Sequence, residues 1–348
     1  MQYFNKQYFF KSSIIILIVL ILNFKQLKVG VIGLRHGVNI GNNLLKYAIH
    51  IKLKELGYLP YIIGTRLKGY NISFINKTTN LVIIKHNFSE IKENDYDILM
   101  VNSDQTWRRF DRHFYDYGFL KFSENWNKKK FIYGASLGFN YWALNSQDEK
   151  IIKKLLKNFT GISVREKGSL KLIRKHLGIT PKVVLDPTLL INKNYYLKII
   201  KNFECCININ SNYILFYHIK KKSIENNFKK NSIQKMKFQV YDYALNRNST
   251  VEKFIYLIVN CKAVITDSYH GTIFSIIFNK PFISFKKRIG SNERLISLGK
   301  LFGLKNRIIN YNQTANAKLL IMPLRINYTI MDNLRKESIN FIKNNLNL

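Results

Sequence analysis

The sequence is poor in the residues that mark several classes of protein. Its three cysteines, Cys205, Cys206 and Cys261, make no disulfide framework and lack metal-site spacing, which suits a reducing compartment such as the cytoplasm. No glycines are spaced as GxGxxG, so a dinucleotide-binding fingerprint is not supported. Zinc-finger spacings and RNP-type aromatic patterns are missing too, so nothing indicates specific nucleic-acid binding.

Acidic residues are scarce. The chain has 21 Asp and Glu against 56 Lys and Arg, for a formal net charge of +35. Lysines are scattered along the chain and accompany abundant Asn and Ile, as AT-rich codons would produce without selection for a basic surface. A genuine excess would favour anionic partners such as phosphates, phospholipid head groups or nucleic acid.

The apolar run near the amino terminus is short. Residues 14–24, IIILIVLILNF, fall below the about 20 apolar residues of a comfortable membrane span. A lysine upstream resembles the start of a signal peptide, but no small-residue cleavage site follows. A weak anchor, a signal-like segment and an upstream start codon that adds non-native residues all fit. We expect residues 1–27 to be an extension outside the fold, with contact at the inner membrane as one role for it.

Strand and helix patterns begin at residue 28 and then alternate. Residues 28–34, KVGVIGL, indicate a buried strand, residues 44–56 show helical spacing, and Gly57 ends that helix. Such alternation is typical of a parallel sheet covered by helices on both faces. Further strands are expected at 96–101, 130–133 and 161–164, and further helices at 148–159 and 167–176.

A second alternating series follows a polar, Asn-rich tract at residues 192–212, which is interpreted as a crossing between domains. We therefore expect an α/β protein with two Rossmann-like domains and a ligand-binding cleft at the carboxyl ends of their strands. The predicted divisions are an amino-terminal extension at 1–27, domains at 28–191 and 213–325 around the crossing, and a carboxyl-terminal helix at 326–348.

The stretch 263–282, AVITDSYHGTIFSIIFNKPF, places one of seven histidines between an expected strand and an expected helix. His270 would lie at the carboxyl end of the strand, facing the cleft, where it could act as an acid or a base near neutral pH. Asp267 could orient it, and Ser268 or Thr272 could cap the helix. Alternatively, Asp267 and Ser268 only cap while His270 packs, and the residues alone leave both readings open.

Two other loops have weaker signals. The loop after the first strand, 35–43, leads into a helix whose backbone N–H groups and dipole attract anions, although a plain turn fits as well. The triplet Asp95-Tyr96-Asp97 superficially resembles a metal-binding DxD motif, but it precedes a strand. We interpret it as loop acids and expect no metal site.

Six segments, taken in order, resemble the polysaccharide pyruvyl transferase family across residues 28–309. They are GVNIGNNLLKYAI, NSDQTW, YGASLG, SVREKGSLKLI, VVLDPTLLI and ITDSYHGTIFSIIFNKPFI. The resemblance implies a GT-B-like fold and transfer of pyruvate from phosphoenolpyruvate to a sugar, or a lipid-linked saccharide, of a surface polysaccharide. It implies no cofactor, because phosphoenolpyruvate is the donor substrate.

The resemblance also suggests roles for individual residues. His270 matches the acid that would protonate the enol methylene. Arg165 could fork onto an anionic oxygen pair, or could instead form an ion pair with Glu166 or another acid. Asp104 could accept a proton from a sugar hydroxyl, or could instead cap a helix. The remaining candidates are Arg294, Ser268, Gly271 and Thr272 on the donor side, and Asn39, Gly41, Asn42, Ser103 and Gln105 on the first domain's loops.

The chain departs from the family pattern in two places. Typical members resemble one another in an R-x-H motif, whose arginine lies two residues before the histidine and helps to bind the donor. In this chain, Ser268 occupies the position of that arginine. Asn102 stands where many members have glycine. Arg294 could replace the missing arginine or be an ordinary ion-paired residue. A nucleotide-sugar glycosyltransferase on the same architecture and a non-catalytic glycan-binding relative are therefore the alternatives.

Overall fold

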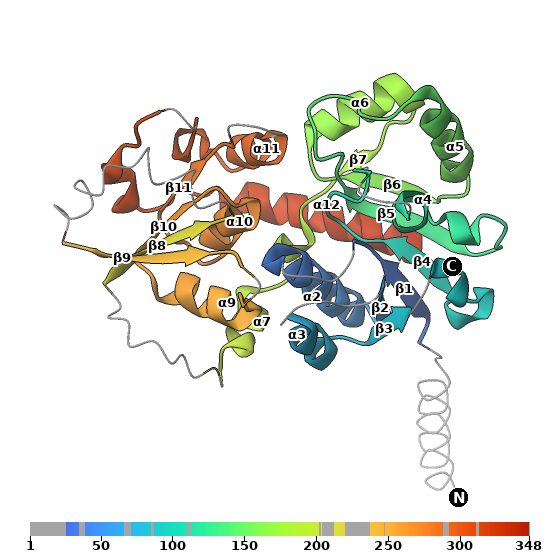
Figure 1. Ribbon diagram of the computed structural model, residues 1–348, viewed down its shortest axis with the longest axis horizontal. Helices are drawn as coiled ribbons and strands as arrows, with labels where there is room; N and C mark the ends of the chain where they lie inside the picture. Colours follow the sequence, from blue (N-terminus) through green and yellow to red (C-terminus); the bar gives the residue numbers. More distant parts are fainter. Residues whose placement is uncertain are drawn as a thin grey trace, which may run out of the picture.

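The computed structural model describes residues 26–34, 39–65, 71–84, 87–109, 113–201, 203, 212–219, 237–246, 248–287, 292–310 and 313–347. These residues form two parallel sheets of seven and five strands, which Figure 1 shows side by side, the first at the right and the second at the left. Two Rossmann-like halves were expected, and they are confirmed. The expected extension lies outside the described residues except for its last two positions. None of the helices described is both long and apolar enough to cross a membrane.

The first sheet has the strand order β3-β2-β1-β4-β5-β6-β7. This is the doubly wound Rossmann order with one strand added at the edge. Runs of Val, Ile and Leu form its central strands because both faces are covered by helices. The strands are β1 (Lys28–Ile32), β2 (Leu59–Thr65), β3 (Leu81–Ile84), β4 (Ile98–Val101), β5 (Lys129–Ala135), β6 (Gly161–Val164) and β7 (Lys182–Val183), and the helices are α2 (Ile40–Glu55), α3 (Asn71–Thr78), α4 (Phe114–Phe119), α5 (Ser146–Leu156) and α6 (Lys167–Leu177).

The second sheet has the order β12-β11-β10-β8-β9, again with every pairing parallel. Its buried strands are as apolar as those of the first sheet. Its strands are β8 (Tyr213–His218), β9 (Gln239–Ala244), β10 (Ala263–Thr266), β11 (Phe282–Phe285) and β12 (Ile308–Ile309), and its helices are α9 (Val251–Asn260), α10 (Tyr269–Ile277) and α11 (Glu293–Leu301).

The tract interpreted as a crossing contains a helix that the weak periodicity did not predict, α7 (Lys193–Ile199), which Asn192 caps by accepting from Asn194 N. The residue limits predicted for the domains and for the crossing remain a prediction. Short 3₁₀ helices complete the fold at η1 (Phe88–Glu90), η2 (Glu93–Asp95), η3 (Lys121–Ser123), η4 (Pro187–Leu189), η6 (Lys305–Arg307) and η7 (Ala317–Leu320).

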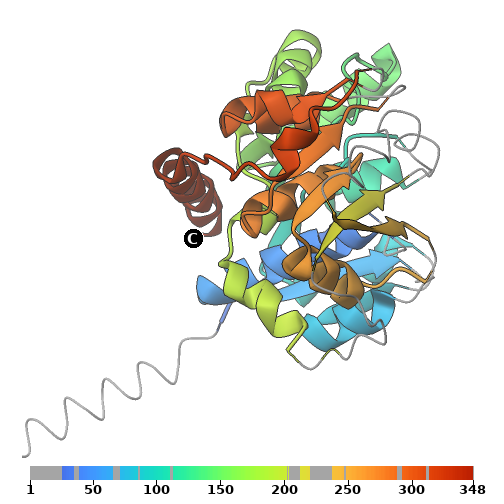
Figure 2. The same ribbon diagram turned by 90° about the vertical axis from the view of Figure 1, so that its left-hand side faces the viewer.

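The last helix, α12 (Tyr328–Leu346), follows the second sheet in sequence but packs on the first. Ser338 Oγ accepts a hydrogen bond from Leu185 N at 2.9 Å, and Phe341 lies 6.2 Å from Tyr133 between ring centroids. Figure 1 shows α12 extending from the second half across to the first, and Figure 2 shows it nearly end-on at the side of the molecule. The carboxyl-terminal helix therefore returns the chain from the second half to the first.

Candidate functional site

The first turn of α10 carries His270. Ser268 is the N-cap of this helix, and its Oγ accepts from Gly271 N at 3.2 Å. Thr272 Oγ1 donates to Ser268 O at 3.0 Å. A Cβ on Gly271 would lie 2.5 Å from Thr266 Oγ1, so only glycine fits there. Of the two candidate caps, Ser268 caps the helix, which begins at Tyr269.

His270 packs against the beginning of α2, in the other half of the molecule. A Cβ on Gly41 would lie 2.0 Å from His270 Nδ1, so glycine makes room for the imidazole ring. Asn39 is the N-cap of α2 and its Oδ1 accepts from Asn42 N at 3.2 Å. The first turn of α2 therefore supports the histidine, and Asn39 has a structural role in capping this helix.

The carboxylate beside His270 is Asp186, whose Oδ2 lies 3.8 Å from His270 Nε2. Asp267, which was expected to orient the histidine, accepts instead from Ile219 N at 2.7 Å. Asp186 follows β7 and its Oδ1 accepts from Thr188 N and Thr188 Oγ1 at 3.0 and 2.6 Å. Sequence reasoning missed Asp186 as a site residue, although it lies in the segment VVLDPTLLI that carried the resemblance.

His270 Nε2 is buried and has no hydrogen-bond partner among the residues that the structure describes. Burial lowers the pKa of His270 to about 4, although the negative charges of Asp186 and Asp104 oppose the shift. The imidazole is therefore neutral near pH 7, with one ring nitrogen free to exchange a proton with a ligand.

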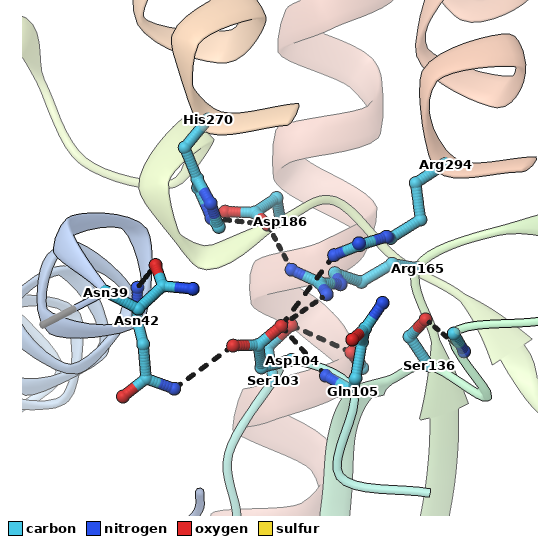
Figure 3. Close-up of polar contacts among 12 residues, drawn as sticks. Asn39, Asn42, Ser103, Asp104, Gln105, Ser136, Arg165, Asp186, His270 and Arg294 are labelled. Atoms are coloured by element: carbon cyan, nitrogen blue, oxygen red, sulfur yellow. Dashed lines mark hydrogen bonds and ion pairs between the residues drawn. The ribbon is translucent and has the colours of Figure 1, made fainter. Parts of the chain in front are cut away.

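Arg165 follows β6 and lies at the centre of the site (Figure 3). Its Nη1 donates to Asp186 Oδ2 at 2.7 Å and its Nη2 to Asp104 Oδ1 at 3.1 Å. Burial disfavours its charge, but the two carboxylates more than compensate and raise the pKa of Arg165. The arginine is thus an ion-paired residue, and its acids are Asp186 and Asp104.

Asp104 adopts a φ of 130°, a conformation that costs energy for a residue other than glycine. Its Oδ1 accepts from Gln105 N at 2.8 Å and its Oδ2 from Asn42 Nδ2 at 3.0 Å. Burial alone would raise the pKa of Asp104, but Arg165 and Arg294 hold it at about 2. Asp104 precedes turns and not a helix, so it is no helix cap.

The side chains next to Asp104 in sequence mainly contact backbone groups of neighbouring segments. Ser103 Oγ donates to Gly134 O at 2.7 Å, which ties the loop after β4 to β5. The Gln105 side chain lies against Gly138, where a Cβ would come within 2.9 Å of it. Asn42 Oδ1 is buried without a hydrogen-bond partner, so its carbonyl oxygen can still accept from a ligand.

Arg294 enters the site from the start of α11 in the second half. Its Nη1 lies 3.7 Å from Asp104 Oδ1, a longer contact than either ion pair of Arg165. Burial and the neighbouring Arg165 lower the pKa of Arg294, while Asp104 opposes them. Arg294 therefore lies beside Arg165 in the cleft as the more weakly paired of the two guanidinium groups.

Two further residues at the site were not singled out from the sequence. Glu166 is buried, and burial raises its pKa against the opposing effect of Arg165. Ser169 Oγ donates to Glu166 Oε1, and the other carboxyl oxygen has no partner. Tyr269 lies beside both arginines. Apart from being next to a candidate residue, Glu166 and Tyr269 had no sequence feature that indicated a role in the site. Their contacts join loops that are far apart in the chain.

Behind this group lies a cavity of about 340 Å³ between α6 and α11. Arg165, Asp186, Tyr269 and Arg294 form one wall of it, and three lysines, Lys167, Lys171 and Lys300, line it as well. The apolar lining is made of Val183, Val184, Leu185, Leu189, Leu298, Leu301 and Leu334.

Two facing Rossmann-like halves, with a last helix that returns to the first, define the GT-B-like class. MnaA from S. aureus, solved with UDP, is 11% identical with a TM-score of 0.54, and the match covers 92% of this chain and 98% of that chain. The putative UDP-N-acetylglucosamine 2-epimerase from Listeria monocytogenes is 10% identical with a TM-score of 0.51, covering 92% and 91%. HepE from Anabaena, solved with UDP-glucose, is 9% identical with a TM-score of 0.51, covering 92% and 97%. At these identities the likeness concerns the fold alone.

The family model for polysaccharide pyruvyl transferase matches residues 39–286, which include His270, Arg165, Asp104 and Asp186 but not Arg294. The chain belongs to the polysaccharide pyruvyl transferase family, and it is by that membership a transferase. The family implies a phosphoenolpyruvate donor and a saccharide acceptor. No curated sequence matches the chain significantly.

Proposed function

We propose that the protein transfers the pyruvyl group of phosphoenolpyruvate to two hydroxyl groups of one sugar in a cell-surface polysaccharide, forming a ketal. The observation that carries this proposal is the meeting of His270 and Arg294, from the second half, with Arg165 and Asp104, from the first. A histidine with a free ring nitrogen beside a weakly paired arginine suits a reaction that moves protons on an anionic substrate.

The reaction needs no net proton. The enol methylene gains one proton and becomes a methyl group, while the two sugar hydroxyls lose two protons as their oxygens bond to the neighbouring carbon. The C–O bond to phosphate breaks, and the departing phosphate takes the second proton. Side chains of the site therefore have to move protons between donor and acceptor without consuming any.

His270 is the residue we propose for the proton that reaches the methylene carbon. It is neutral in the free protein because burial lowers its pKa to about 4. The carboxylate and phosphate of a bound donor add negative charge nearby, which favours the protonated imidazole. His270 would then gain a proton when the donor binds and deliver it during the reaction.

Arg294 is the residue we propose to hold the anionic groups of the donor. Arg165 already faces two carboxylates, so its charge is compensated, whereas Arg294 has a single ion pair among the described residues, at 3.7 Å. Arg165 would align Asp104 and Asp186. It would contribute positive electrostatic potential to the site but would not bind the donor in a bidentate manner. Ser268, Gly271 and Thr272 would shape the start of α10 beside the donor, since Ser268 caps this helix.

The acceptor sugar would bind along the loops of the first half. We assign the hydroxyl contacts to Asn42 Oδ1, which lacks a hydrogen-bond partner among the described residues, and to the Gln105 amide, while Asn39, Gly41 and Ser103 hold the first half's loops in place. Asp104 is a weak base with a pKa of about 2, so we assign it to orienting Asn42 and the arginines. Proton removal from the sugar would then fall to His270 or to the departing phosphate.

The cavity behind the site supports a finer version of this proposal. Its apolar lining and its three lysines suit an aliphatic chain that carries phosphate, so the acceptor would be a lipid-linked saccharide. Such an acceptor would place the enzyme in the cytoplasm at the inner membrane surface. The scarcity of cysteine is consistent with that compartment.

Phosphate release from phosphoenolpyruvate, measured with a panel of acceptor saccharides, tests the proposal. We expect release that depends on an acceptor and that falls about 10²-fold or more in His270→Asn, the usual effect of a lost general acid. Arg294→Met should raise KM for phosphoenolpyruvate, and Arg294→Lys should restore part of the loss. Turnover of nucleotide sugars without consumption of phosphoenolpyruvate would favour a glycosyltransferase, and binding of glycans without turnover would favour a non-catalytic relative.

A further inference from the structure

One aromatic ring contacts both arginines of the site. Tyr269 occupies the first turn of α10, between Ser268 and His270. The guanidinium carbon of Arg294 lies 5.0 Å from the centroid of its ring, and that of Arg165 lies 5.3 Å from it. Both distances fall within the about 6 Å range of a cation–π interaction. Because Arg165 belongs to the first half and the other two residues to the second, the ring joins the halves.

Arg294 has little else to fix its position. Its one ion pair with a described carboxylate is the 3.7 Å contact with Asp104, and no described residue hydrogen-bonds its guanidinium group. The positive charge of Arg165 acts against it, since Arg165 lowers the pKa of Arg294. A long, flexible side chain in this situation would sample several rotamers unless a surface held it.

The face of the tyrosine ring provides that surface. Its negative quadrupole attracts both cations, so the ring can hold two like-charged groups near one another at a smaller electrostatic cost. The ring also lines the cavity together with the two arginines, so all three border the same space.

We propose that Tyr269 is a positioning residue that fixes Arg294 beside Arg165 and so completes the anion-binding group of the donor site. This inference rests on the proposed function. It explains how a chain with Ser268, in place of the arginine of typical relatives, can still bind a multiply charged donor. The ring is the feature that matters, so the phenol hydroxyl should be dispensable.

Calorimetric titration with phosphoenolpyruvate tests the inference in four variants. We expect Tyr269→Phe to bind within about 2-fold of wild type because the ring is kept. Tyr269→Leu should raise Kd by about 10-fold, which corresponds to about 1.4 kcal/mol. If Tyr269→Leu fails to fold by circular dichroism, Tyr269→Met keeps an unbranched apolar side chain at the same place. Tyr195→Leu removes a cation–π contact with Lys198 on α7, outside the site, and should bind like wild type.

A double-mutant cycle separates positioning from packing. In an Arg294→Met background, Tyr269→Leu should have an effect of less than about 2-fold, because the group it positions is gone. With an active acceptor, Tyr269→Leu should raise KM for the donor more than it lowers kcat. Equal binding by wild type and Tyr269→Leu, or additive effects with Arg294→Met, would overturn the role of Tyr269. A wild type that binds no phosphoenolpyruvate would overturn the proposed function itself and the positioning role with it.

Discussion

Burial holds His270 neutral in the free protein, and its proposed function therefore depends on the charge that a ligand brings. Its pKa of about 4 lies below the ordinary histidine value of 6.5 because the ring loses solvent, and the nearby carboxylates only partly restore the cation. Such a residue responds to the arrival of an anion by binding a proton. The same property makes the response measurable.

Phosphoenolpyruvate binding at pH 6.5 should be accompanied by proton uptake. We expect the binding enthalpy to vary with the ionisation enthalpy of the buffer, with an uptake of up to about one proton per site. His270→Asn should bind with reduced uptake. His50→Asn is the matched control, since burial also lowers the pKa of His50 to about 4 but His50 is no part of the site. Uptake that is unchanged in His270→Asn would assign the proton to another group.

Both histidines should also affect stability in acid. Because the folded-state pKa of His270 is depressed, the unfolded chain binds more protons between about pH 6.5 and 4, and stability falls as pH falls through that window. Each depressed histidine contributes in this direction independently of any ligand. Binding and stability data can therefore be compared on the same variants.

At the scale of elements, the site depends on two helices that begin opposite one another. α2 and α10 each start where a chain segment leaves a sheet, and their first turns meet at Gly41 and His270. Each start is fixed by a side-chain cap, Asn39 for α2 and Ser268 for α10. The fit between the two helices is tight because glycine occupies the contact.

Gly41→Ala should reduce acceptor-dependent phosphate release by about 10-fold or more. The added Cβ would lie 2.0 Å from His270 Nδ1, so the imidazole or one helix must move. Overpacking of this kind costs about 1–3 kcal/mol, which a denaturation curve would detect. Gly33→Ala is the control, because its Cβ would make an ordinary 3.5 Å contact with Asn102. Wild-type activity in Gly41→Ala would mean that the ring does not need this position.

Long buried strands and amphipathic helices were predictable from the sequence. β1, β4, β8 and β10 are runs of β-branched and other apolar residues, and α6 and α9 have clear helical periodicity. The strands β7 and β12 were not predictable, because two residues are too few to show an alternating pattern. α7 was missed because its sequence is polar on most faces and its packing is set by the rest of the fold.

The candidate site was predictable in its location but not in its pairings. A histidine between a strand and a helix marks a place at the cleft. The partner of that histidine, Asp186, comes from a loop of the other half, and no local pattern could point to it. For the same reason, the sequence left open whether Arg165 faces a ligand or an acid, and the structure pairs it with two acids.

At the scale of the whole molecule, α12 connects the two halves. Its hydrogen bond from Leu185 N to Ser338 Oγ joins the last helix to the segment that carries Asp186. Packing of Phe341 on Tyr133 adds apolar contact. The position of Asp186 in the site therefore depends in part on a helix from the far end of the sequence.

Ser338→Ala should lower the free energy of unfolding by about 1–3 kcal/mol, because the buried Leu185 N–H would lose its acceptor. Urea denaturation followed by circular dichroism would measure the change. Glu337→Ala, at the preceding residue, is a control. The 3.4 Å contact of Glu337 with Lys182 is solvent-exposed, and such pairs contribute about 0–1 kcal/mol to the free energy of unfolding. Equal stability of Ser338→Ala and wild type would indicate that another group or a water replaces the hydroxyl.

The return of α12 also limits how the molecule can move. The chain passes between the halves twice, once between η4 and β8 and once before α12. A body attached to another at two separate points keeps chiefly one rotation, about the line that joins the points. Opening and closing of the cleft should be a rotation about that single axis. The same rotation would admit donor and acceptor to the cleft and bring them together.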